Sequence, residues 1–143
     1  MYDERLVAPM RAELTRLGFE ELKTPEAVDS KLKDADGTTL VVVNSVCGCA
    51  ARNARPAVAM ALQQGGARPD TLTTVFAGQD TAATQRARGY FTGYGPSSPS
   101  IGLMKDGKLV FMLERYQIEG RMADDIARDL SAAFDKHCAG AKV

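Results

Sequence analysis

Two cysteines separated by one glycine are the residues of this chain with the clearest chemical potential. Cys47, Gly48 and Cys49 follow an apolar, β-branched run and precede a segment with helical character. A thiolate at a helix start is stabilised by free backbone N–H groups and by the helix dipole, which lowers its pKa. The spacing therefore predicts thiol–disulfide exchange, with Cys47 as the attacking thiol and Cys49 as the resolving thiol.

Neighbouring residues support this interpretation. Arg52 and Arg55 would lie in the first turns of the helix and add positive potential near Cys47. A disulfide across Cys-Gly-Cys closes a very small ring, and Gly48 would relieve part of its strain through backbone angles closed to other residues. A strained disulfide is easily reduced, which favours disulfide isomerisation or removal of a low-molecular-weight thiol over general protein reduction.

Two other interpretations of the cysteines stay open at this point. Cys47, Cys49 and Cys138, the last preceded by His137, could hold zinc or an iron–sulfur cluster in a carrier protein. The usual ligand spacings, with two or more intervening residues, are absent, so we expect no metal. Alternatively, the thiols are small core residues, because free cysteines are often buried.

The composition indicates an ordinary globular protein. The chain has 143 residues, which suits one domain over residues 1–143, and 45% of them are hydrophobic. Eighteen basic residues balance eighteen acidic ones, so no overall field would hold nucleic acid or an anionic membrane. The sequence shows no membrane span or signal peptide, and its odd, low cysteine count suits a reducing compartment, so we expect a cytoplasmic protein.

Periodicity and turn residues predict helices that alternate with strands. Residues 38–45 form an uninterrupted β-branched run, typical of a central strand covered on both faces. Asp106-Gly107 lies between two apolar runs and is a strong hairpin signal. The expected helices are 6–17, 25–36, 50–64, 80–89 and 122–134, and the expected strands are 19–22, 38–45, 72–76, 100–104 and 109–113. This order predicts an α/β protein, a thioredoxin-like three-layer fold with a central mixed sheet and an additional N-terminal helix.

Apolar spacing also predicts which helix faces are buried. The first helix is expected to start or kink at Pro9. Its buried stripe would be Leu6, Met10, Leu14 and Leu17. For the helix after the cysteines the apolar members are Ala51, Val58, Met60 and Leu62, and for the last helix Met122, Ile126, Leu130 and Phe134. These stripes would pack on the sheet.

Several joined motifs resemble the bacilliredoxin family over nearly the whole chain. The resemblance lies in residues 41–51, Phe-Ala-Gly-Gln-Asp at 76–80, Tyr-Phe-Thr-Gly at 90–93 and Pro-Ser-Ser-Pro-Ser at 96–100. It implies a thioredoxin-like fold and removal of bacillithiol, or a similar small thiol, from S-thiolated cytosolic proteins. Disulfide isomerase activity is also attributed to such proteins. The resemblance implies no cofactor, with the small thiol as co-substrate.

Site residues carry over position by position. The resemblance makes Cys47 the nucleophile and Cys49 the second cysteine of the Cys-Gly-Cys motif. Pro99 matches the proline that thioredoxin-like proteins hold in cis opposite the active site. The backbone of Ser98 would then pair with an incoming substrate strand, so we expect Gly48, Ser98 and Pro99 to bind substrate. An ordinary rigid loop is the alternative for this proline segment.

One position departs from thioredoxin itself. The buried aspartate that thioredoxins carry on the strand before their first cysteine is Val41 here. Without that carboxylate, proton transfer during resolution must use water, the substrate or another group. We expect a monomer or a weak homodimer whose partners are S-thiolated proteins and the small thiol.

Overall fold

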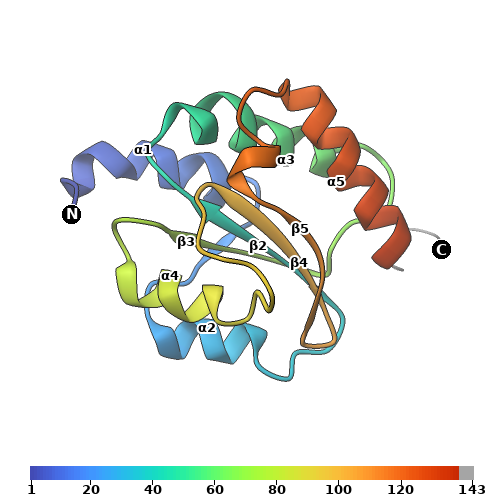
Figure 1. Cartoon of the computed structure of the whole chain (residues 1–143), viewed down its shortest axis with the longest axis horizontal. Coiled ribbons are helices and arrows are strands. Elements are labelled where there is room, and N and C mark those ends of the chain that lie inside the picture. The colour runs from blue at the N-terminus through green and yellow to red at the C-terminus, as the bar shows by residue number, and fades with distance from the viewer. Residues whose placement is uncertain (139–143) are drawn as a thin grey trace.

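A central sheet with helices on both faces forms the core of the computed structural model, which describes residues 1–138 (Figure 1). Its elements are α1 (Glu4–Thr15), β1 (Glu20–Glu21), α2 (Pro25–Leu32), β2 (Thr38–Asn44), the π-helical segment η1 (Ala50–Ala54), α3 (Arg55–Gln63), β3 (Thr71–Phe76), α4 (Thr81–Arg88), β4 (Ser100–Lys105), β5 (Lys108–Leu113), the 3₁₀ turn η2 (Arg115–Gln117) and α5 (Ala123–His137). No helix in this described part is long and apolar enough to cross a bilayer.

The five strands form one mixed sheet in the order β1-β3-β2-β4-β5. The central strand β2 pairs in parallel with β3 and antiparallel with β4. Every residue of β2 is buried, as the uninterrupted apolar run predicts. Asp106 and Gly107 join β4 to β5 with φ angles of 50° and 81°, which suits a tight hairpin turn. The expected α/β class, mixed sheet and hairpin are confirmed.

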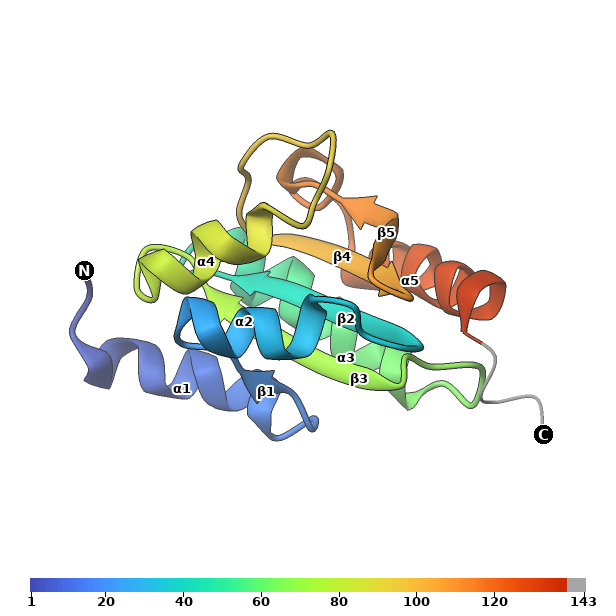
Figure 2. The same ribbon diagram turned by 90° about the horizontal axis from the view of Figure 1, so that it is seen from below.

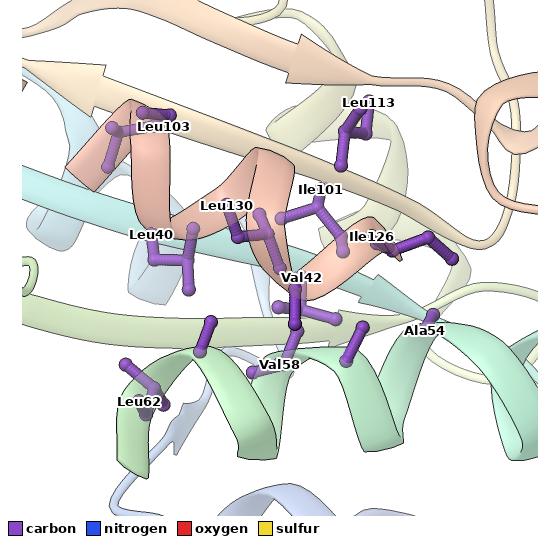
Figure 3. Packing of buried hydrophobic residues seen from close by; sticks show 14 of the residues in the cluster. Leu40, Val42, Ala54, Val58, Leu62, Ile101, Leu103, Leu113, Ile126 and Leu130 are labelled. Carbon is purple, nitrogen blue, oxygen red and sulfur yellow. The ribbon is translucent and has the colours of Figure 1, made fainter. Parts of the chain in front are cut away.

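Two clusters of buried side chains, one on each face of the sheet, attach the helices. Because successive strand residues point to opposite faces, β2 places Leu40 and Val42 in one cluster and Val41 and Val43 in the other. α3 and α5 cover the first cluster, where their side chains meet those of β2 and β4 (Figure 3). α2 and α4 cover the second cluster on the other side (Figure 2). The result is the expected three-layer, thioredoxin-like arrangement.

The buried face of α1 differs from the expected one. Of the two positions expected for Pro9, the structure has the proline inside the helix and not at its start, and Leu6 is 51% exposed. The buried residues of α1 are Val7, Arg11 and Leu14. Arg11 tolerates burial because three carboxylates pair with its guanidinium, which also lies over the ring of Phe76. Because the buried face of α1 includes an arginine, the spacing of apolar residues alone does not predict it.

The helix after the cysteines is also less regular than expected. It begins as the π-helical segment η1, and Pro56 follows in the first turn of α3. Proline has no N–H to donate to the carbonyl four residues earlier, and the π turn changes the phase of the apolar stripe. As a result Ala51 is exposed and Met60 is 36% exposed.

Two further expectations are wrong at element ends. Met122 caps α5 from outside the helix and is 69% exposed, whereas Ile126, Leu130 and Phe134 are buried as expected. α2 ends at Leu32, short of residue 36. The short turn η2 was not expected at all, because its three residues carry no apolar period.

Candidate active site

The cysteine motif lies in the turn between β2 and η1, at the carboxyl end of the central strand. Cys47 and Cys49 are free thiols, and both are partly buried. The Cys47 carbonyl accepts hydrogen bonds from the N–H groups of Ala50 and Ala51 at 3.1 and 3.2 Å, so the chain turns helical directly after the motif. The motif thus has the expected place between strand and helix, although the first turn is π-helical.

Arg55 holds the backbone just before Cys47. Its buried guanidinium donates to the Asn44 side-chain oxygen at 2.8 Å and to the Ser45 carbonyl at 3.0 Å. It also pairs with Glu13 at 2.9 Å, which offsets its positive charge. The structure therefore shows Arg55 supporting the turn that carries the motif.

Arg52 packs against the motif itself. A Cβ on Gly48 would lie 2.5 Å from a guanidinium nitrogen of Arg52, so the missing side chain leaves room for this arginine. Gly48 is not among the glycines with positive φ in this structure of the free thiols. Space beside Arg52, and not a special backbone angle, is what the glycine provides here.

Arg115 is the functional cation that the sequence analysis missed. One guanidinium nitrogen lies 3.9 Å from the Cys49 sulfur, and another donates to the Ser98 carbonyl at 3.1 Å. Its Nε pairs at 3.1 Å with Glu119, whose carboxylate accepts a hydrogen bond from the Cys49 thiol at 3.8 Å. Arg115 is separated from Cys49 by 66 positions, so no local spacing could have indicated the contact.

Hydrogen bonds and charge move the pKa values of the two thiols in opposite directions. Burial works to raise the pKa of Cys47, but the Ser45 hydroxyl, the N–H groups of Ala50 and Cys49 and the charge of Arg115 outweigh it and lower that pKa. Burial and the negative charge of the Cys47 thiolate raise the pKa of Cys49. The arrangement favours a thiolate at Cys47 and a protonated thiol at Cys49.

The peptide bond between Ser98 and Pro99 is cis, in agreement with the family resemblance. Ser98 lies beside Cys47 in the wall of one pocket. Its carbonyl accepts a hydrogen bond from Arg115, so a substrate strand that pairs with Ser98 would share this oxygen with the guanidinium.

The pocket beside Cys47 has a volume of about 340 Å³. Its walls include Ser98, Arg88, Arg115 and Tyr2. The Tyr2 N–H donates to the Gln79 side chain at 2.8 Å, and the Gln79 amide donates back to the Tyr2 carbonyl at 3.1 Å. These two bonds hold the N-terminal segment at the pocket, which has the size of a small-ligand site.

Cys138 lies far from the other two cysteines. It follows α5, is 3% exposed and lies next to Thr38 at the start of β2, whereas Cys47 follows the end of that strand. A strand of seven residues is roughly 20 Å long. Burial raises the pKa of the Cys138 thiol. The three thiols do not converge, and residues 1–138 contain no cluster of three side chains able to hold a metal ion.

A thioredoxin-like fold with a reactive Cys-Gly-Cys turn defines a thiol–disulfide oxidoreductase, and comparison with known proteins agrees. The family model described as disulphide isomerase matches residues 2–138. The chain is 54% identical to a bacilliredoxin of Koribacter versatilis over 99% of both chains. It is 53% identical to bacilliredoxins of Bacillus licheniformis and Staphylococcus aureus, over 96% of this chain and 95% and 94% of theirs. The chain belongs to the bacilliredoxin family.

Proposed function

We propose that this protein removes bacillithiol, or a similar low-molecular-weight thiol, from mixed disulfides on proteins in the cytoplasm. The observation that carries the proposal is the Cys-Gly-Cys turn between β2 and the helix, with two free thiols and with Arg115 and Glu119 beside Cys49. A pocket beside Cys47 gives room for a small thiol. The name bacilliredoxin, which the relatives share, supports bacillithiol as that thiol.

In the first step the Cys47 thiolate attacks the sulfur of the small thiol within the mixed disulfide. A bond forms between Cys47 and the small thiol, the original disulfide breaks, and the substrate protein leaves as a thiolate that takes a proton from water. Arg115 stabilises the attacking thiolate. Gly48, Ser98 and Pro99 form the backbone surface on which the substrate protein lies.

In the second step Cys49 attacks the Cys47 sulfur and releases the small thiol. Cys49 must first lose its proton, and the Glu119 carboxylate at 3.8 Å accepts it. Glu119 thereby supplies the carboxylate that the strand position Val41 lacks. The product is a Cys47–Cys49 disulfide, which an external thiol reduces. Alternatively, a second small thiol attacks the mixed disulfide on Cys47 and regenerates the thiolate directly.

The test uses a reporter protein with one cysteine that carries bacillithiol, and mass spectrometry to follow both proteins. Cys47→Ala is expected to abolish release of the small thiol. Cys49→Ala is expected to take one small thiol onto Cys47 and to accumulate in that form. Release by Cys47→Ala at the normal rate would contradict the proposal.

The family model's description favours disulfide isomerisation as a second activity. Here Cys47 attacks a protein disulfide, and a thiol of the substrate, instead of Cys49, resolves the mixed disulfide. No net oxidation or reduction occurs. Recovery of activity by oxidised, scrambled ribonuclease should depend on Cys47 and persist in Cys49→Ala, and no recovery with wild-type protein would exclude this activity.

A further inference from the structure

We infer that Arg88 and Arg115 form a carboxylate-binding subsite for the small thiol in the pocket beside Cys47. This inference rests on the proposed function, because its ligand is the thiol that becomes attached to Cys47. It adds the two residues that would bind the part of that thiol away from its sulfur, and it gives Arg88 a role that exchange chemistry alone does not require.

Arg88 ends α4 as a half-buried cation that has no acidic partner within residues 1–138. Its Nε is buried and has no hydrogen-bond partner among residues 1–138, and its Nη2 donates only to the Ser97 carbonyl at 3.3 Å. Arg86, on the same helix, pairs with Asp29 at 2.6 Å. Partial removal of a charge from water without a partner costs free energy, and an anionic ligand would offset that cost.

Arg115 lines the same pocket from η2. The carbonyls of two adjacent residues orient the two arginines, since Ser97 accepts from Arg88 and Ser98 accepts from Arg115. Glu119 pairs with Arg115 through Nε. Planar guanidinium groups match carboxylates well, because two N–H groups can donate in parallel to the two oxygens.

The pocket favours a small thiol with carboxylates on the far side of the molecule from its sulfur. None of the pocket's lining residues within 1–138 is acidic, and two of them are arginines. A volume of about 340 Å³ gives room for a small thiol attached to Cys47. With its sulfur on Cys47, such a thiol would extend its carboxylates to the arginines.

The experiment compares three small thiols on one reporter cysteine: mercaptosuccinate with two carboxylates, neutral 2-mercaptoethanol and cationic cysteamine. The measured quantity is kcat/KM for release by wild type, Arg88→Met and the matched control Arg86→Met, which removes a cation from the same helix away from the pocket. Arg88→Met should lower kcat/KM for mercaptosuccinate roughly tenfold or more, with a much smaller effect on 2-mercaptoethanol. Arg86→Met should change neither value by more than about twofold.

Several results would overturn the inference. An equal loss with all three thiols in Arg88→Met would assign a structural role to Arg88. Arg88→Lys keeps the charge, so it should retain part of the preference for mercaptosuccinate even if Arg88→Met fails to fold. A second reporter carries acidic residues beside its cysteine. If the loss of kcat/KM in Arg88→Met depends on which reporter is used and not on which thiol it carries, the arginines bind the protein substrate. Equal rate enhancement of release for all three thiols contradicts the subsite alone, whereas failure to release bacillithiol itself from the reporter contradicts the proposed function.

Discussion

Around the two active-site sulfur atoms, single contacts decide which thiol reacts first. Arg115 and Glu119 lie next to Cys49, but their effects differ in sign. The positive charge of Arg115 favours the thiolate form of Cys47, whereas the negative charge of Glu119 contributes to the raised pKa of Cys49. These opposing effects suit a pair in which one thiol attacks and the other waits.

Replacement of Arg115 should make Cys47 less reactive at neutral pH. Arg115→Met removes a cation that lowers the pKa of Cys47 together with the hydrogen bonds from Ser45, Ala50 and Cys49, so the thiolate fraction should fall by roughly twofold to threefold at pH 7. The rate of Cys47 alkylation by iodoacetamide against pH, measured in a Cys49→Ala background, reports this change. Arg115→Lys should retain most of the reactivity, and an unchanged pH midpoint in Arg115→Met would contradict the assignment.

Replacement of Glu119 tests whether its carboxylate accepts the Cys49 proton or acts on Cys49 only through its negative charge. If Glu119 accepts the Cys49 proton, Glu119→Gln should slow release of the small thiol several-fold near pH 7, and the difference should fade as the pH rises. If Glu119 acts only by its charge, its loss should lower the pKa of Cys49 and speed release. Rapid-quench mass spectrometry of the Cys47 mixed disulfide distinguishes the two, with Glu119→Asp as the conservative variant.

At the scale of elements, the site depends on how β2 passes into a helix. The strand ends at Asn44, the motif follows, and the first helical turn is the π-helical segment Ala50–Ala54. Such π turns are frequent at functional sites. Arg55, directly after the π turn, reaches back to Asn44 and Ser45 and so ties the two ends of the turn together.

Loss of Arg55 should destabilise the protein more than loss of Arg52. Arg55→Met removes the donor to the Ser45 carbonyl and one of two donors to the Asn44 side-chain oxygen, and it breaks the pair with Glu13, so we expect a loss of about 2–3 kcal/mol in the free energy of unfolding. Arg52→Met is the matched control, with an expected change within about 0.5 kcal/mol. Urea unfolding of the reduced proteins measures both, and equal stabilities would contradict the supporting role.

Across the whole molecule, the two helix layers are attached differently. α3 and α5 share a large apolar cluster with the sheet (Figure 3). α2 and α4 share the smaller cluster and are also joined by polar contacts, in which Asp29 of α2 pairs with Arg86 of α4 at 2.6 Å and accepts from the Tyr90 hydroxyl at 2.7 Å. The contact between α2 and α4 therefore includes an ion pair in addition to apolar packing.

Acid should weaken the contact between α2 and α4. The Arg86 guanidinium and the Tyr90 hydroxyl lower the pKa of Asp29 from 3.8 to about 2. A carboxylate whose folded pKa lies below its unfolded one stabilises the fold above the unfolded pKa, and that contribution is lost as the pH falls through about 4 towards about 2.

Asp29→Asn should therefore be less stable than wild type at pH 6, and the gap should shrink at pH 3. Urea unfolding at the two pH values checks this, with exposed Asp36→Asn as the control for loss of a surface carboxylate. A gap that stays constant with pH would assign the effect to the lost hydrogen bonds alone.

The sequence by itself determined the features that depend on short-range order. The β-branched run at residues 38–45 predicts the central strand, because a strand covered on both faces has apolar side chains at consecutive positions, as residues 40–43 do. Asp106-Gly107 predicts the hairpin, because both residues adopt positive φ. The cysteine spacing predicts exchange chemistry at the junction between strand and helix.

Only the tertiary structure decided which distant groups meet these residues. Arg115, Glu119 and Ser98 reach the cysteine motif from segments that follow it by about fifty to seventy positions, and no periodicity records that approach. Burial of Arg11 likewise depends on carboxylates from three elements or loops, and Cys138 is kept from the motif by the length of β2. Contacts between remote segments follow from how the layers pack, which local sequence patterns do not encode.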